Sequence, residues 1–268
     1  MSDLAEFFES VKLPVMPEVA QALIRTLGDE DISISVVRNI IAKDPALTAK
    51  LLRLANSAQF GLSRKVDSLD NAISMVGMSQ IRTLALSASM HVAFPVAPGL
   101  DRTEFWRGSM ACAGYAQWLA GGAGMNRQEA WLTGMMSRLG ELIIGQKDPA
   151  SLAEIEKLPR LPGSRWQREQ MLFGFNEVQI TAVMARRWNF PDAIVIGLET
   201  AADPMVSEPF RPLSGVIHLA TLLADTPDPG PAALGQLPDA VVSALGLNRD
   251  WMLSRMPDPS SFIDVSSI

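Results

Sequence analysis

Apolar side chains recur every three or four residues along most of this chain, between prolines and glycines that interrupt the pattern. In the segment after Pro17, the residues Leu23, Ile24 and Leu27 share one face, and Gly28 follows. A stripe with this spacing lies on one side of an α-helix, and proline in the first turn with glycine after the last residue is typical of its two ends. No strand-like alternation or fixed-period repeat stands out. The sequence therefore predicts an all-α protein.

The same periodicity divides the chain into many short helices. Asp44, Asn126 and Asn176 each precede an apolar stripe and are predicted N-caps, with Glu129 completing a capping box at Asn126. The end of the chain from Pro257 contains proline and serine, and we expect it to be mobile. The predicted helices cover residues 4–11, 17–27, 33–44, 45–56, 68–77, 78–90, 103–120, 126–144, 151–157, 164–174, 177–188, 193–200, 212–225, 238–245 and 248–256.

Composition places the chain among globular proteins. At 268 residues with 48% hydrophobic content, it is long and apolar enough to bury one large core or two smaller ones. The net charge of -6 argues against a general binder of nucleic acid, whose affinity comes from clustered lysine and arginine.

The sequence carries no recognisable membrane segment or secretion signal. Its longest apolar runs, such as residues 193–198, fall far short of the roughly 20 residues that a spanning helix needs. The amino terminus is acidic where a secretory signal would be basic. Cys112 is the only cysteine, which excludes an internal disulfide and fits a reducing compartment. We expect a cytoplasmic protein without membrane contact, in which Cys112 is buried and has no activating group nearby.

The middle of the chain carries the most informative pattern. A Phe105-Trp106 pair comes shortly before Gly108 on the first of two predicted helices, and Ser137-Arg138 lies on the second. This layout resembles the metal-binding helix pair of the HD superfamily of phosphohydrolases, and more closely its non-catalytic branch, the HDOD domain.

Two further segments, 40–61 and 174–191, also resemble HDOD sequences. The resemblance implies a multi-helix HDOD fold, in which an HD-like helical bundle is preceded by an N-terminal helical subdomain. A stretch with two prolines and a glycine separates these halves. We therefore predict an N-terminal helical half over residues 1–95, a degenerate HD-like half over 100–226, and a linker with a short helical tail over 227–268.

The side chains that would bind a metal in the HD pattern are missing. Gly108 stands where the pattern has histidine, Ser137-Arg138 where it has His-Asp, and Asn176 where HDOD sequences often have histidine. Divalent cations need imidazole or carboxylate ligands, and the positive charge of Arg138 would repel them. Asp203 is a single remaining carboxylate. We predict no catalytic residue, no metal ligand and no cofactor.

The resemblance implies a bacterial cytoplasmic regulatory module, from a family often attached to cyclic-dinucleotide enzymes or receiver domains. We expect a stand-alone, non-catalytic adaptor that binds signalling proteins, with cyclic-dinucleotide and two-component pathways as the candidate sources of partners. One alternative is a metal-dependent phosphohydrolase with atypical ligands. Another is a DNA-binding regulator that reads DNA through residues 68–90, where Gln80 and Arg82 are the available polar side chains.

Several other candidates are more simply structural. His91 near a helix end, where a partly charged imidazole would face helix carbonyls, and His218 in an apolar segment lie outside the HD ligand positions. The glycine cluster at 121–124 lacks the strand and the lysine of a phosphate-binding loop and indicates a helix break. Asn56 and its neighbours Arg53 and Ser57 are expected to pack or cap. The basic residues expected on solvated faces are Arg53, Arg64, Lys65, Arg82, Arg186 and Arg187.

One binding hypothesis remains for the space that the missing ligands leave. A pocket between Gly108 and Ser137-Arg138 could receive an anion, with the guanidinium of Arg138 as its positive end. Stabilisation of the protein by phosphates or nucleotides would be its first sign.

Overall fold

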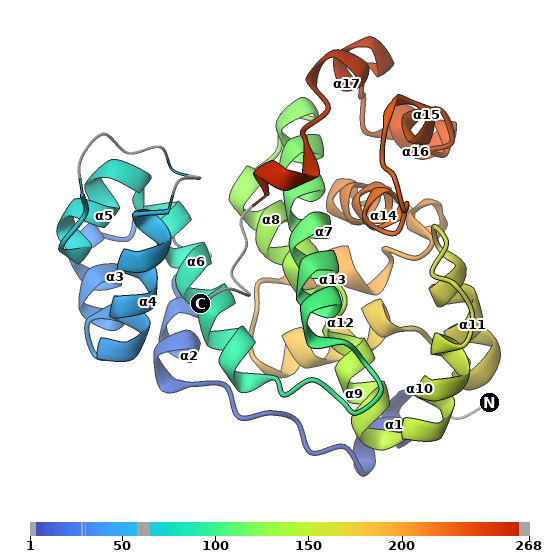
Figure 1. The fold of residues 1–268 in the computed structure, drawn as a ribbon, viewed down its shortest axis with the longest axis horizontal. Helices are drawn as coiled ribbons and strands as arrows, with labels where there is room; N and C mark the ends of the chain where they lie inside the picture. The colour runs from blue at the N-terminus through green and yellow to red at the C-terminus, as the bar shows by residue number, and fades with distance from the viewer. Residues whose placement is uncertain (1–3, 28, 30, 58–59, 61–64, 263–268) are drawn as a thin grey trace.

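The computed structural model describes residues 4–27, 29, 31–57, 60 and 65–262, and within them all regular secondary structure is helical (Figure 1). The all-α prediction is therefore confirmed. The predicted helix terminator Gly28 and the basic residue Arg64 lie outside the described residues. The helices are α1 (Leu4–Glu9), α2 (Glu18–Ile24), α3 (Ile34–Ile41), α4 (Pro45–Ala55), α5 (Leu69–Val76), α6 (Met78–Ala93), α7 (Arg102–Gly122), α8 (Arg127–Met136), α9 (Leu139–Lys147), α10 (Pro149–Glu156), α11 (Ser164–Phe173), α12 (Glu177–Arg187), α13 (Asp192–Glu199), α14 (Pro212–Ala224), α15 (Pro231–Gly235), α16 (Asp239–Ala244) and α17 (Arg249–Arg255), with 3-10 turns η2 (Pro204–Val206) and η3 (Pro259–Ser261).

Side-chain caps start the helices where the sequence predicted them. The carboxylate of Asp44 accepts a hydrogen bond from the backbone N–H of Leu47, and Asn126 and Asn176 cap α8 and α12 in the same way. The predicted capping box at Asn126 is wrong, because only the asparagine half of it forms. A complete box forms at Asn176, where the side chain of Gln179 returns a bond to the backbone of Asn176.

The glycine cluster at 121–124 ends α7, as the sequence predicts. The helix continues through Gly122, and the chain turns at Gly124, whose φ of +68° favours glycine. A Cβ on Gly122 would stand 2.4 Å from the ring of Trp251. The missing side chain therefore lets α17 lie directly against α7, and the ring of Trp251 stacks on Trp118 with centroids 5.4 Å apart.

Two other boundaries differ from the prediction. The segment predicted as one helix over 126–144 is divided into α8 and α9, and the division falls at Ser137-Arg138. The proline-rich linker after residue 225 contains a short helix, α15, because Pro231 occupies the first helical position, where its missing N–H costs nothing.

Two clusters of buried apolar side chains stabilise the fold. The first contains residues from Phe7 to Leu198 and includes the helices α2 to α6, of which α3, α4 and α5 lie at the left of Figure 1. The second extends from Cys112 to Met252 and packs α7 against α14, α16 and α17. Helix α7, in the centre of Figure 1, supplies side chains to both clusters. None of the described helices combines the length and the apolar character needed to cross a membrane.

The last described residues pack against α7. The ring of Phe262 meets Tyr115 edge to face with centroids 4.9 Å apart. It fills the space that Gly114 leaves open, since a Cβ there would stand 2.2 Å from the ring. The segment from Pro257, which we expected to be mobile, thus contacts α7 through Phe262, and Pro259, Ser260 and Phe262 line a cavity described below.

Candidate functional site

Three helices bring the predicted ligand positions into one region. Gly108 lies in the first half of α7, Ser137-Arg138 between α8 and α9, and Asn176 at the start of α12. Helices α9 and α12 approach closely because Gly140 has no side chain: a Cβ there would stand 2.1 Å from the carbonyl oxygen of Glu177.

The guanidinium of Arg138 occupies the space next to Gly108. A Cβ on residue 108 would stand 1.6 Å from Nη1 of Arg138, so the arginine uses volume that any larger residue would fill. The hydroxyl of Ser137 donates to the carbonyl of Gly134 at 2.8 Å, and the side chain of Asn176 caps its helix. The four positions, 108, 137, 138 and 176, therefore offer no side-chain atom that is both unprotonated and free to bind a metal ion.

A divalent cation of the kind that HD hydrolases bind does not fit these residues. Such an ion would meet a fixed positive charge where it needs imidazole or carboxylate ligands. Across the described residues, no group of three or more His, Cys, Asp or Glu side chains has metal-binding geometry. Asp203, the carboxylate singled out in the sequence, is exposed on the turn before η2.

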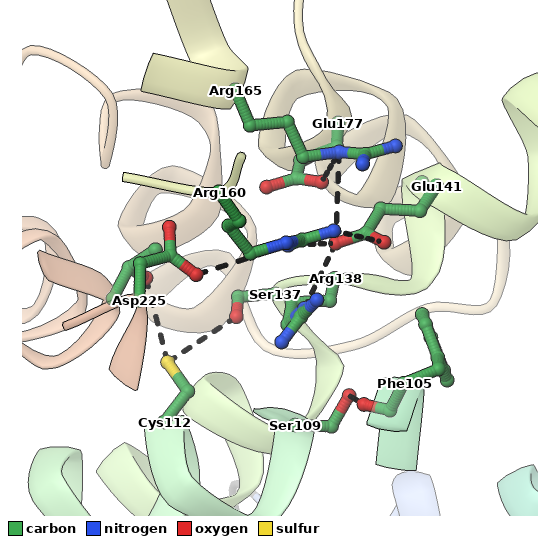
Figure 2. Close-up of polar contacts among 12 residues, drawn as sticks. Phe105, Ser109, Cys112, Ser137, Arg138, Glu141, Arg160, Arg165, Glu177 and Asp225 are labelled. Carbon is green, nitrogen blue, oxygen red and sulfur yellow. Dashed lines mark hydrogen bonds and ion pairs between the residues drawn. The ribbon is translucent and has the colours of Figure 1, made fainter. Parts of the chain in front are cut away.

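The charge of Arg138 is part of a buried ion-pair network (Figure 2). Its Nε donates to Oε1 of Glu141 at 2.8 Å, and Arg160 binds both carboxylate oxygens of the same glutamate at 2.8 and 2.9 Å. Glu141 has no exposed surface. On the other side of the network, Nη1 of Arg160 lies 3.8 Å from Oδ1 of Asp225.

Arg165 forms the second centre of this network. Its Nε lies 2.8 Å from Glu169, 2.9 Å from Glu177 and 3.7 Å from Glu141, and its Nη1 pairs with Glu156. The side chain is 2% exposed. Breaking one partner of such a buried set costs about 3–5 kcal/mol, because it leaves the others unpaired in a medium of low dielectric.

The pKa values of the carboxyl groups in the network shift in opposite directions. Burial alone would raise the pKa of Glu141, but the charges of Arg138, Arg160 and Arg165 hold it well below its usual range. Burial raises the pKa of Glu169 to about 7 against the opposing charge of Arg165.

The two remaining carboxyls shift in the same direction as Glu169. Burial and the neighbouring Glu169 and Glu141 raise the pKa of Glu177, and burial raises that of Asp225 despite nearby arginines. Glu141, by contrast, is shared among three guanidinium groups.

A cavity of about 980 Å³ opens beside the network. Its lining comes from the start of α7, the network, the end of α14 with the segment after it, and the end of the described chain. The charged lining residues are Asp101, Glu104, Arg107, Arg138, Glu141, Glu156, Arg160 and Asp225. Its apolar lining includes Leu100, Phe105, Met110, Leu223, Pro227 and Phe262.

The two histidines and the cysteine are structural. Nε2 of His91 lies 2.7 Å from Nη2 of Arg102, which can only donate. Nε2 is therefore the acceptor in this contact, which holds the ring in place and fits the structural role predicted for His91. The ring of His218 places Nδ1 2.8 Å from the carbonyl of Ala201, and burial lowers its pKa. Burial raises the pKa of Cys112, although the charge of Arg138 acts on it, contrary to the expectation that no cation is near.

The residues proposed for reading DNA are engaged inside the protein. Nη1 of Arg82 donates to the carbonyl of Thr26 at 2.6 Å, so its assignment to a solvated face is wrong. Gln80 accepts a hydrogen bond from Gln128 at 2.6 Å. These two contacts leave the segment 68–90 without the side chains on which DNA reading depended.

The other basic and polar candidates are placed as predicted. Asn56 both donates to and accepts from the backbone of Val66, at 2.6 and 2.7 Å, and so fixes the chain after α4. Arg186 and Arg187 are exposed, with Arg186 paired to Glu199 and Arg187 over the ring of Phe8. Arg53 and Lys65 are also exposed.

Sequence reasoning missed most of the network. None of Arg160, Arg165, Glu169 and Glu141 was singled out from the sequence. One signal was present: Arg165 and Glu169 are four residues apart, a spacing that places opposite charges together on a helix. That spacing does not distinguish a solvated pair from a buried one.

Together, the helical bundle and the arginine in the ligand pocket define a protein with the HD scaffold and an altered set of site residues. The chain belongs to the HDOD family: the HDOD domain model matches residues 13–204.

Similar proteins share this fold along nearly the whole chain. A crystal structure from Shewanella amazonensis SB2B, provisionally assigned as a phosphohydrolase, is 27% identical with a TM-score of 0.76, covering 96% of this chain and 95% of its own. An HDOD domain protein of unknown function from Geobacter sulfurreducens is 21% identical with a TM-score of 0.77, covering 94% and 92%. A protein of Treponema pallidum (strain Nichols) is 23% identical over 249 residues, which are 90% of this chain and 47% of that protein. This chain therefore spans about half the length of that relative.

Proposed function

We propose that this chain is a non-catalytic regulatory module of bacterial signal transduction, which works in the cytoplasm by binding other proteins. The observation that supports a non-catalytic role is the position of Arg138. Its guanidinium lies against Gly108 and is paired with the buried Glu141. Metal-dependent hydrolysis needs a bound ion to generate hydroxide and to polarise the phosphorus–oxygen bond, and a cation is repelled from this position.

A second candidate is a metal-dependent phosphohydrolase with atypical ligands. Its support is the 27% identity to the Shewanella protein that is provisionally assigned to that class. The two candidates differ in whether the purified protein holds a metal and turns over a phosphate ester.

One assay separates these candidates. The purified chain is analysed for bound transition metals and assayed with bis-p-nitrophenyl phosphate and p-nitrophenyl phosphate in the presence of Mn²⁺. We expect no stoichiometric metal and no hydrolysis above that of the buffer. Stoichiometric metal with turnover that Glu141→Gln or Asp225→Asn abolishes would support the hydrolase and contradict our proposal.

Exposed apolar side chains at the end of α11 support a role in protein binding. Met171 is 78% exposed and Leu172 is 52% exposed. Arg168, one turn earlier, donates to the carbonyls of Leu158 and Pro159, so the loop before α11 lies against the same helix. Neighbouring apolar side chains exposed on a helix are typical of a surface that binds another protein.

The partner we propose is a signalling protein, first sought among cyclic-dinucleotide enzymes and receiver domains. The test uses the full chain as bait with purified candidate partners of these two classes. We expect Met171→Ser with Leu172→Ser to weaken binding at least tenfold, and Leu253→Ser, an exposed apolar change on α17, to leave it unchanged. Failure of every candidate to bind the unaltered chain would count against the proposal.

A further inference from the structure

The wall of the cavity beside Arg138 contains hydrogen-bond donors that have no acceptor among the residues that the structure describes. The Nε of Arg138 is used by Glu141, but among the described residues its two Nη groups donate no hydrogen bond. The side chain is 7% exposed. In Figure 2 the guanidinium lies between Glu141 and the α7 residues Ser109 and Phe105.

Tyr115 adds a second donor without an acceptor. The hydroxyl of Tyr115, which is completely buried at the cavity wall, has no hydrogen-bond partner in the described part of the chain. Burial raises its pKa, so it remains a phenol and a donor. Oδ1 of Asp225 accepts no hydrogen bond there and lies 3.8 Å from Nη1 of Arg160, with which it forms an ion pair.

The carboxylates at the wall do not offset this excess. Glu141 is neutralised by three arginines and has no exposed surface. Glu104 is paired with Arg107 and Glu156 with Arg165, and the carboxylate of Asp101 accepts the backbone N–H of Glu104. A buried donor without an acceptor costs about 1–3 kcal/mol, so a ligand that supplies acceptor oxygens removes that penalty when it binds.

The apolar part of the cavity limits the kind of ligand further. Leu100, Phe105 and Met110 line one side, and Phe262 lines the side formed by the end of the described chain. A bare inorganic ion would leave these surfaces in contact with water. An aromatic or aliphatic body attached to the charged group would cover them.

We infer that this cavity is a binding site for a small organic oxyanion, a carboxylate or a phosphate monoester, whose oxygens are bound by the Nη groups of Arg138 and whose apolar body packs against Phe105 and Phe262. A guanidinium binds two oxygens of either group in the same plane, so both sources share this chemistry. The site lies apart from the exposed apolar residues of α11, and it goes beyond the proposed function, which does not depend on it.

The test measures binding of three probes to the full chain by titration calorimetry: phenyl phosphate, benzoate and inorganic phosphate. We expect phenyl phosphate or benzoate to bind at least ten times more tightly than inorganic phosphate. The stronger of the two organic probes identifies the preferred oxyanion. Equal affinity for phenyl phosphate and inorganic phosphate would overturn the apolar part of the inference, and no binding by any probe would overturn all of it.

Two variants locate the binding within the cavity. Gly108→Ala places a methyl group where Nη1 of Arg138 now lies and should weaken binding of the organic probe at least tenfold. Gly121→Ala is the matched control, since it makes the same change on the same helix, where the nearest atom is 3.4 Å away on the flexible side chain of Arg127. Ala111→Trp, which fills the cavity without touching the network, should also abolish binding. Equal affinity in Gly108→Ala, Ala111→Trp and the control would place binding elsewhere and contradict the inference.

Discussion

Gly108 and Arg138 fit together so closely that a side chain at position 108 and the observed guanidinium cannot both be present. The space at Gly108 is filled by Nη1 of Arg138, 1.6 Å from where a Cβ would stand. In the HD pattern this position carries histidine. The glycine and the arginine therefore act together. The guanidinium of Arg138 occupies the place where the HD pattern has a histidine side chain that binds a metal ion.

A histidine at position 108 should consequently destabilise the protein. Gly108→His forces Arg138 away from its place, and overpacking of this kind costs about 1–3 kcal/mol. In the Arg138→Ala background the same change should cost at least about 1 kcal/mol less, because the competing side chain is gone. Urea unfolding of the two single variants and the double variant measures this coupling. Additive effects would show that the two residues do not compete for the same space.

Arg165 should be more important for stability than any exposed arginine. Arg165→Met removes the cation nearest to Glu169 and Glu177, and leaving buried carboxyls without it should lower the free energy of unfolding by about 3–5 kcal/mol. Arg53→Met on the exposed face of α4 should change it by less than about 0.5 kcal/mol. Urea unfolding at pH 8 checks both, and an effect of Arg165→Met as small as the control would contradict the arrangement.

Glu169 should make the protein less stable as the pH rises from about 4.5 to about 7. Its pKa is about 7 in the folded protein and near 4.5 when unfolded, so the folded state binds more protons over this range. Stability from this group is fully present below the unfolded pKa and is lost as pH approaches the folded one, by about 3 kcal/mol in total.

Glu169→Gln should remove that part of the pH dependence. Unfolding free energies measured at pH 4.5, 6, 7 and 8 should fall less steeply in the variant than in the unaltered chain. Glu177 shifts in the same direction and remains in the variant, so a residual fall is expected. An unchanged slope would contradict the assignment to Glu169. The stability that depends on ionised Glu141 is lost only at lower pH, below the usual range of a glutamate.

Asn56 should anchor the chain that follows α4. Asn56→Ala removes a donor and an acceptor from the backbone of Val66, and an unsatisfied backbone group costs about 1–3 kcal/mol. Asn71→Ala, which loses only an exposed bond to Asp67, should cost less than about 0.5 kcal/mol. Thermal unfolding of the two variants distinguishes them, and equal melting temperatures would count against an anchoring role.

Phe262 should hold the end of the chain against α7. Gly114→Ala puts a methyl group into the ring and should release residues 257–262, which limited proteolysis detects as faster cleavage in this segment. Gly235→Ala, where nothing lies within 4 Å, is the control. Unchanged cleavage in Gly114→Ala would show that the contact contributes little.

The helices could be predicted from the sequence because the residues that mark a helix lie within it or next to it. Caps such as Asp44 and Asn176 satisfy backbone groups within three residues, and apolar spacing marks the buried face whatever it packs against. The contacts between distant helices were not accessible in this way. The sequence marks a helix break at 121–124, but the close approach of Trp251 to Gly122 joins residues more than a hundred positions apart.

The site could be predicted only in part for the same reason. The absence of ligands at Gly108 and Asn176 was visible in the sequence, since it depends on residue identity alone. The place of Arg138 was not, because its charge is paired by Glu141 one turn away and by a network assembled from four helices and the loop before α11. Arg82 shows the converse: a residue assigned to the surface forms a half-buried bond to Thr26 across fifty-six positions.

Helix α7 is a shared spine, since Phe105 and Met110 belong to one apolar cluster and Tyr115 and Leu119 to the other. Because α7 contributes side chains to both apolar clusters, we expect the two clusters to unfold together. Cleavage of the backbone between α6 and α7 should therefore yield two fragments that stay associated and lose their structure in a single cooperative step, and neither should survive as an autonomous folding unit.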